Sequence, residues 1–288
     1  MTAMSNLLDP NNPLFFAAVV PLCAALAATG LIRLLGGTDR GAGLAVVGAG
    51  IGFLIAYFLV FGAPIYPPRA STHKMPYLAV AGVLIGFALD ALRPAPAVVR
   101  GAMLAWLAVG ILWLAESLLR RGGIVLPVAV TAGALIAGWR LARQDSQTLA
   151  APLMILTMAL GLSGIAFIAA SASIAQIAAA LAAALGGYML WNWPKFRFPF
   201  GAAGVLGIGA TAIFLGGQMA LYTRADKWAL AVLLLVPFAD IAFRRIAPGQ
   251  GTVGNVVAPV AIGIACAVPA IAAVAIAHFM RSGGSIGY

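Results

Sequence analysis

Continuous apolar runs of about 20 residues, separated by short polar breaks, fill almost the whole chain. A transmembrane helix needs about 20 consecutive apolar residues, whereas the strands of a membrane barrel alternate over about 10. Backbone polar groups must be paired inside lipid, so uninterrupted runs of this length predict helices that cross a bilayer. The runs lie at approximately 14–35, 42–62, 76–92, 97–119, 123–141, 149–170, 173–192, 200–222, 228–245 and 254–280. The pattern therefore predicts an all-α, polytopic bundle of about ten transmembrane helices.

The polar breaks are too short to hold a soluble domain, so residues 1–288 are expected to form a single integral membrane domain. The stretch from Gly62 to Tyr77 differs from the other breaks because it combines four prolines, two tyrosines, a histidine and two cationic residues. We expect this stretch to be the main loop outside the membrane. Its candidate docking residues are Tyr66, Arg69, His73 and Lys74.

Composition supports the membrane assignment, because 63% of the residues are hydrophobic and only 8% are charged. Soluble domains carry about 25% charged residues. The net charge of +10 comes from 17 Lys and Arg spread singly or in pairs over the breaks. That distribution suits lipid headgroups and membrane topology rather than a nucleic acid, and we predict no nucleic-acid partner. Cys23, Cys266 and two histidines lack the spacing of a disulfide, metal or heme site, so no cofactor is predicted.

Lys and Arg divide ten against seven between alternate sides of the predicted bundle. In an inner (cytoplasmic) membrane, this bias favours placing both termini and the Gly62–Tyr77 stretch away from the cytoplasm. Five helices per half would make residues 14–141 and 149–280 inverted repeats. A shift of about 132 residues aligns Pro127 with Pro259. The helix count and chain length are similar to those of the drug/metabolite transporter superfamily; the resemblance is architectural and carries over no residue role.

Carboxylates inside predicted helices are candidates for function because a buried charge is costly in a membrane. Each one is followed three or four residues later by an arginine: Asp90 by Arg93, Glu116 by Arg120, and Asp240 by Arg244. These spacings place opposite charges on one helix face, which predicts interfacial ion pairs. Glu116 is the strongest functional candidate of the three because Trp113 precedes it by about one turn. Arg140, near a helix end, is expected to extend toward the headgroups.

Glycine spacings predict where helices approach closely. Gly48 with Gly52, and Gly82 with Gly86, each form a small-xxx-small pair that admits a neighbouring backbone.

Two functions from different classes remain open. Prolines and glycines at Pro127 with Gly133, and at Pro259 with Gly263, predict interrupted helices in corresponding positions of two halves, which is typical of a transporter site. They favour a transporter or facilitator for a small, uncharged or anionic solute. The alternative is a non-catalytic membrane subunit or assembly factor, which docks other membrane subunits through the Gly62–Tyr77 stretch. No catalytic arrangement of residues indicates an enzyme.

Overall fold

The computed structural model describes residues 15–37, 40–68, 70–244 and 252–283, and this part of the chain is 82% helix with no strands. Seven of its helices are long and apolar enough to cross a membrane, which indicates a membrane protein. They are η1–α2 (Phe15–Gly36), α5 (Ser71–Leu92), α6 (Pro96–Leu114), α9 (Ala150–Ile168), α10 (Ala172–Asn192), α11–η2–α12 (Gly201–Tyr222) and part of α15 (Thr252–Gly283).

The other three predicted runs are shorter or broken. The helices α4 (Val47–Phe61) and α8 (Val125–Leu141) are apolar but shorter, and α3 (Arg40–Leu44) precedes α4. The run at 228–245 divides into α13 (Lys227–Leu233), η3 (Val236–Phe238) and α14 (Ala239–Arg244). Pro237, at the start of η3, has no backbone N–H to continue an α-helix. Within the described residues, the predicted count of about ten spanning helices is therefore not confirmed.

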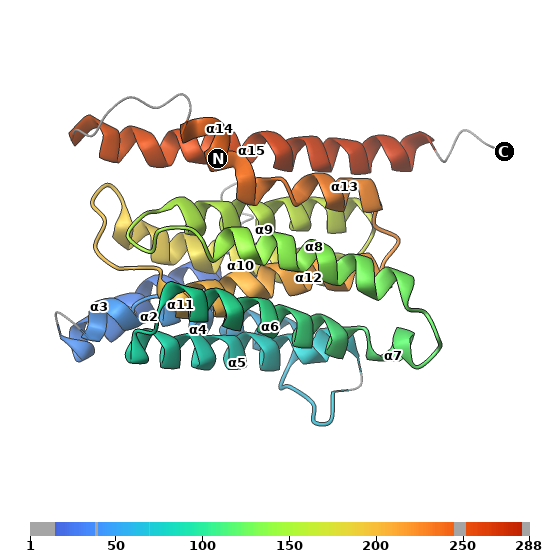
Figure 1. Cartoon of the computed structure of the whole chain (residues 1–288), viewed down its shortest axis with the longest axis horizontal. Coiled ribbons are helices and arrows are strands. Elements are labelled where there is room, and N and C mark those ends of the chain that lie inside the picture. Colours follow the sequence, from blue (N-terminus) through green and yellow to red (C-terminus); the bar gives the residue numbers. More distant parts are fainter. Residues whose placement is uncertain (1–14, 38–39, 69, 245–251, 284–288) are drawn as a thin grey trace.

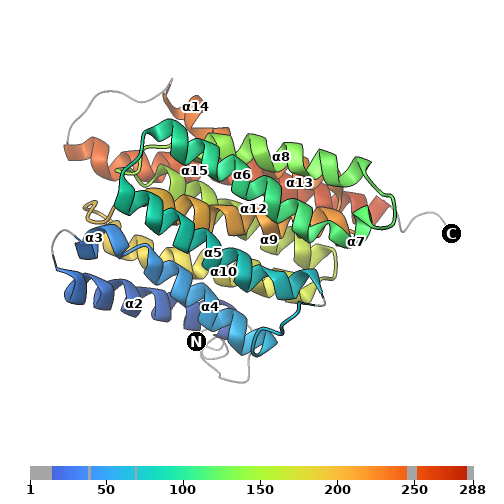
Figure 2. The same cartoon turned by 60° about the horizontal axis from the view of Figure 1, so that its bottom comes forward.

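The helices lie side by side along the long axis of the molecule, with α5 and α15 on opposite edges (Figure 1). The helix Gly201–Tyr222 is the central element, since 89% of its apolar stretch is buried, against 22% for α15. It packs against α5, α6, α8 and α9, and α5 and α6 lie in front of α12 in Figure 2. The short helix α7 (Glu116–Leu119) and α14 lie toward opposite ends of the bundle, which we call the α7 end and the α14 end.

The glycine spacings mark close backbone contacts, as predicted. A Cβ atom added to Gly52 would lie 2.6 Å from the carbonyl oxygen of Pro21 in α2. A Cβ atom added to Gly86 would lie 2.5 Å from the carbonyl oxygen of Ala202 in the central helix. Both distances are too short for any side chain, so these glycines allow α4 to approach α2 and α5 to approach α11.

Candidate functional site

The first turns of α5 contain residues that the sequence assigned to a loop. The helix begins at Ser71, so His73 and Lys74 are helical and the loop spans only about 62–70. Pro76 does not delay the start of the helix, although it has no N–H to donate to the carbonyl oxygen of Thr72. The buried Tyr57 hydroxyl donates to that oxygen instead, at 3.1 Å. The expectation of a loop over Ser71–Tyr77 was therefore wrong.

Starting the helix at Ser71 places the ammonium group of Lys74 inside the bundle, where the residue is only 8% exposed. Its Nζ donates to the carbonyl oxygen of Trp113 at 2.6 Å and to Oε2 of Glu116 at 3.1 Å. It also lies 5.2 Å from the centre of the Trp113 ring, within range of a cation–π interaction. A buried ammonium is tolerated only when it is paired in this way.

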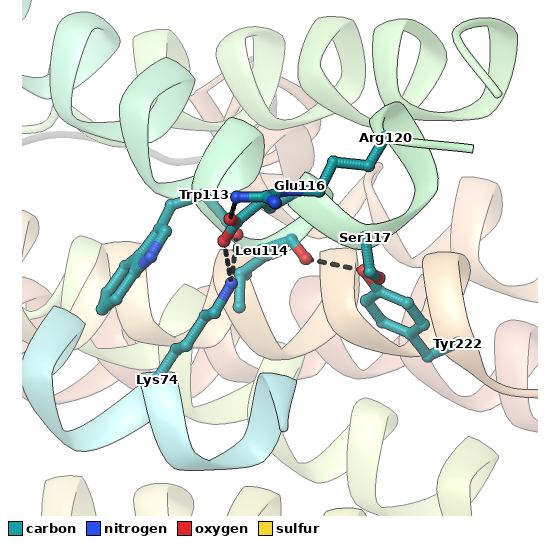
Figure 3. Close-up of polar contacts among 7 residues, drawn as sticks. All are labelled: Lys74, Trp113, Leu114, Glu116, Ser117, Arg120 and Tyr222. Atoms are coloured by element: carbon teal, nitrogen blue, oxygen red, sulfur yellow. Dashed lines mark hydrogen bonds and ion pairs between the residues drawn. The ribbon is translucent and has the colours of Figure 1, made fainter. Parts of the chain in front are cut away.

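The partners of Lys74 come from an interruption at the end of α6. This helix ends at Leu114, Ala115 follows as its C-cap, and α7 begins at Glu116. Carbonyl groups at a helix C-terminus lack intrahelical donors and carry partial negative charge. Lys74 satisfies one of these carbonyls, and the Tyr222 hydroxyl donates to another, that of Leu114, at 2.7 Å (Figure 3).

The ionised groups at this interruption enclose a pocket of about 390 Å³ at the α7 end. Glu116 accepts from Lys74 and, at 2.7 Å, from Nη2 of Arg120, and Figure 3 shows both cations pointing at one carboxylate. The hydrogen bond from Lys74, followed by that from Arg120, lowers the pKa of Glu116 below its usual 4.5, so it is ionised at neutral pH. Two cations and one carboxylate give the pocket a net positive charge. The lining residues are Pro68, Ala70, Ser71, Lys74, Leu114, Glu116, Ser117, Arg120 and Tyr222.

Polar groups continue from this pocket toward the bundle centre. Ser71 Oγ, which lines the pocket, accepts from Nε2 of Gln218 at 3.2 Å, and Gln218 is buried in α12. The Oε1 atom of Gln218 has no hydrogen-bond donor among the described residues. Likewise, the Nε1 atom of Trp106 has no acceptor among them. Trp106 lies between α5 and α12, because its Nε1 is 3.0 Å from the Cβ position of Gly82 and its ring contacts Phe214. The interface of α5, α6 and α12 thus holds unsatisfied polar atoms.

A second ion pair lies toward the α14 end. Arg140 of α8 donates to Asp240 of α14, and Gln144 Nε2 lies 3.5 Å from the same carboxylate. The side chains of Arg140 and Asp240 are only 12% and 4% exposed. Arg140 was expected to extend to the headgroups, and that expectation was wrong. The side chain of Arg244, the expected partner of Asp240, lies outside the described residues.

Asp90 has a different role from the predicted pairing with Arg93. It accepts hydrogen bonds from the backbone N–H groups of Ala202 at 2.8 Å and Ala203 at 2.9 Å. A carboxylate at a helix N-terminus satisfies free N–H donors and the positive end of the helix dipole. Asp90 therefore fixes the end of α5 to the start of the central helix.

The proline and glycine candidates lie in two separate places. Pro127 lies in the first turn of α8, and Gly133 lines an apolar cavity of about 260 Å³ between α8, α9, α12 and α13. Pro259 lies within α15, where Gly263 faces Leu153 of α9. The structure does not bring the two pairs into one cavity among those of the described residues.

The candidate docking residues are also separated. Tyr66 is 85% exposed in the 62–70 loop, and its ring lies 6.5 Å from that of Tyr77. His73 is half-buried, Lys74 belongs to the pocket, and Arg69 lies outside the described residues. Sequence reasoning missed the roles of Tyr222 and Ser117 and the partnership of Lys74 with Glu116.

No protein-family model matches the chain, and no curated protein sequence matches it.

Proposed function

We propose that the protein is a transporter or facilitator for a small solute, and that the solute enters through the pocket around Lys74. The buried ammonium group of Lys74 carries this proposal. Desolvating such a charge costs several kcal/mol even when it is paired, so a purely structural bundle gains little from it. Ionisable groups of this kind in membrane proteins mark pathways for ions or substrates.

The charge of the pocket favours a solute that carries a carboxylate or a phosphate. Lys74 and Arg120 supply donors on two sides of Glu116, and an anionic group could take charge-assisted hydrogen bonds from both. Glu116 would accept from an ammonium group, so a zwitterion also suits the pocket. The sequence predicted an uncharged or anionic solute, and the charges of the pocket lead us to propose an anionic or zwitterionic one.

The central helix supports a path beyond the pocket. Gln218 and Tyr222 lie one turn apart in α12 near the pocket, and the apolar cavity lies against α12 at Ala212, Gly216 and Gly217. The same helix contains a π-helical turn, η2 (Gly204–Gly209), and such turns are frequent at functional sites. A helix flanked by two cavities is suited to let a solute pass along it.

Uptake into proteoliposomes tests the proposal. We expect the purified protein to take up some members of a panel of radiolabelled small carboxylates, phosphate esters and amino acids above the level of empty liposomes. Lys74→Met and Arg120→Gln should reduce uptake at least tenfold. Arg121→Gln, an exposed neighbour that does not line the pocket, should leave it unchanged. No uptake of any solute by correctly folded protein, or equal losses in all three variants, would refute the proposal.

Docking of another membrane subunit is the second candidate, and the exposed tip of the loop favours it. Ile65 and Tyr66 are 47% and 85% exposed beside each other. A deletion that tests docking must spare Ser71 and later residues, because they begin α5 and include the buried Lys74. Replacing both Ile65 and Tyr66 by serine should abolish co-purification of a specific partner and leave the uptake assay unchanged. A partner that is retained by this variant argues against docking at the loop.

The proposed orientation places the α7 end, with this pocket, away from the cytoplasm of the inner membrane. Reporter fusions to the 62–70 loop and to the 142–149 connection should report opposite sides. Cytoplasmic signal from the 62–70 fusion contradicts this orientation.

A further inference from the structure

Two short segments of the chain, one at each ion pair, share a sequence pattern. Residues 115–121 read Ala-Glu-Ser-Leu-Leu-Arg-Arg, and residues 239–245 read Ala-Asp-Ile-Ala-Phe-Arg-Arg. The offset between the two segments is 124 residues, which also aligns Arg100 with Arg224 and is shorter than the shift of about 132 that aligns Pro127 with Pro259. Each segment therefore has a carboxylate after an alanine and a pair of arginines beginning four residues later. The first overlaps the end of the fourth apolar run (97–119) and the second forms the end of the ninth (228–245), which are equivalent positions in two five-run halves.

The two segments also occupy equivalent places in the fold. Ala115 is the C-cap of α6 and Ala239 is the C-cap of η3, so each follows an interruption of a helical run. The next residue, Glu116 or Asp240, lies in the first turn of the short helix that follows. These short helices, α7 and α14, lie toward opposite ends of the bundle (Figure 1). Equivalent segments at opposite ends are what an inverted repeat requires.

Neighbouring helices pack in matching pairs in the two halves. α2 packs on α4 as α9 packs on α10, and α6 packs on α8 as α13 and α14 pack on α15. The third helix of each half, α5 and the central helix, pack on each other. The arrangement is not symmetric everywhere, since α8 packs on α12 whereas α15 packs on α9. The packing of neighbouring helices thus fits an inverted repeat whose two halves are arranged differently.

The hairpin of α6, α7 and α8 connects the two ion pairs mechanically. Glu116 lies at the α7 end of this hairpin and is held by Lys74 of α5. Arg140 lies at its other end, in the last turn of α8, and is held by Asp240 of α14. The 17 residues of α8 span about 25 Å, so the two attachments lie toward opposite ends of the hairpin. Because α5 and α14 lie on opposite sides of the hairpin, a shift of the hairpin away from α5 and toward α14 separates the first pair and presses the second together.

We propose that Glu116 and Asp240 are equivalent gate carboxylates of an inverted repeat, whose ion pairs with Lys74 and Arg140 open in turn at the two membrane faces. This inference rests on the proposed transport function. Both pairs are formed in the structure, and the α7 end is the more accessible of the two. Glu116 is 42% exposed in an open pocket at the α7 end, whereas Asp240 is 4% exposed at the α14 end.

Cysteine labelling at both gates tests the coupling without a solute. The background is a variant with Cys23 and Cys266 replaced by alanine, reconstituted in nanodiscs. One reporter is Ala70→Cys, which lies in the pocket at the α7 end, and the other is Gln144→Cys, which lies beside the carboxylate at the α14 end. The reaction rate of each with a hydrophilic maleimide reports how open that gate is. With the native ion pairs, the Ala70 reporter should react faster.

Breaking one pair should shift the two rates in opposite directions. Glu116→Gln should speed labelling at Ala70→Cys by about threefold or more and slow labelling at Gln144→Cys by a similar factor, as expected for a two-state shift. Asp240→Asn should do the reverse. Arg121→Gln is the control and should change neither rate. If Asp240→Asn does not fold, the two reporters in Glu116→Gln still decide the question.

The coupling is overturned if each substitution affects only its own gate, or if both rates rise together, since either shows local loosening. Failure of the coupling is distinct from failure of the transport proposal. If a solute is taken up but the two labelling rates change independently, the coupled gates are refuted and the transport proposal stands. If the two rates change in opposite directions but no solute is taken up, the transport proposal is refuted and the two-state motion stands.

Discussion

Replacing Gly86 by alanine should weaken the fold at a point where no side chain can give way. The added Cβ atom would lie 2.5 Å from the carbonyl oxygen of Ala202 and 2.5 Å from the Cα atom of Ala203, both backbone atoms of the central helix. Ordinary contacts begin at about 3.4 Å, so α5 must retreat by about 0.9 Å. Asp90 lies one turn further along α5 and caps the same two residues, so the retreat also lengthens its hydrogen bonds.

The expected loss follows from three contributions. Overpacking of a close contact costs about 1–3 kcal/mol, and weakening a hydrogen bond to a charged group costs up to about 1.5–3 kcal/mol. The gain in helix propensity on changing glycine to alanine offsets about 0.5–1 kcal/mol. We therefore expect Gly86→Ala to lower the free energy of unfolding by about 2–4 kcal/mol. Gly101→Ala is the matched control in α6, where the added Cβ atom meets nothing within 4 Å. It should be neutral or stabilising by up to about 1 kcal/mol.

Equilibrium unfolding in mixed micelles of a denaturing and a mild detergent measures both variants against the native chain. A Gly86→Ala variant as stable as Gly101→Ala would refute the close approach of α5 to α11. A loss that disappears when Asp90→Asn is already present would show that the cap, rather than the packing, carries the effect.

Three further changes have expected outcomes in the same unfolding assay. Asp240→Asn should lower the free energy of unfolding by about 3–5 kcal/mol, because it leaves the guanidinium of Arg140 buried without its carboxylate. Adding Arg140→Met should recover much of that loss. A further loss of stability in the double variant contradicts the ion pair. Tyr57→Phe should lose about 1–3 kcal/mol because the carbonyl oxygen of Thr72 then has no donor, and unchanged stability contradicts this role. The cationic partners of Glu116 lower its pKa from 4.5, so its contribution is complete above pH 4.5 and is lost as the pH falls through the lowered pKa. The stability difference between the native chain and Glu116→Gln should therefore vanish in acid, and a constant difference contradicts the ion pair.

Features that depend on neighbouring residues could be predicted from the sequence. The apolar runs locate the spanning helices because every backbone group in lipid must be paired locally. The spacing of Gly82 and Gly86 predicts a close contact because only an absent side chain lets backbones meet. Pro76 was the exception, since its helix continues through it and Tyr57, on a different helix, supplies the missing donor.

Features that depend on distant residues could not be predicted. Local spacing assigned Glu116 to Arg120, and the structure adds Lys74, 42 residues away. It assigned Asp240 to Arg244, and the structure brings Arg140 from 100 residues away. An i to i+4 pattern finds partners on one helix face, whereas a buried charge takes whichever cation the packing of helices presents. The repeated pattern around Ala115 and Ala239 was the available signal for the role that we propose these two carboxylates share.

The interruption of a helix and the ion pair beside it are physically linked. When α6 ends within the bundle, the carbonyl groups of its last turn lose their donors and present partial negative charge. A cation from another helix satisfies them, and Lys74 does so through the carbonyl of Trp113. Glu116, a carboxylate placed just after the interruption, balances the charge of that cation and makes the contact breakable. Protonation or substitution of Glu116 weakens the contact, and a bound anion can compete with Glu116 for the cation. Fixed backbone hydrogen bonds allow no such exchange, so a bundle that moves should move at its interrupted helices.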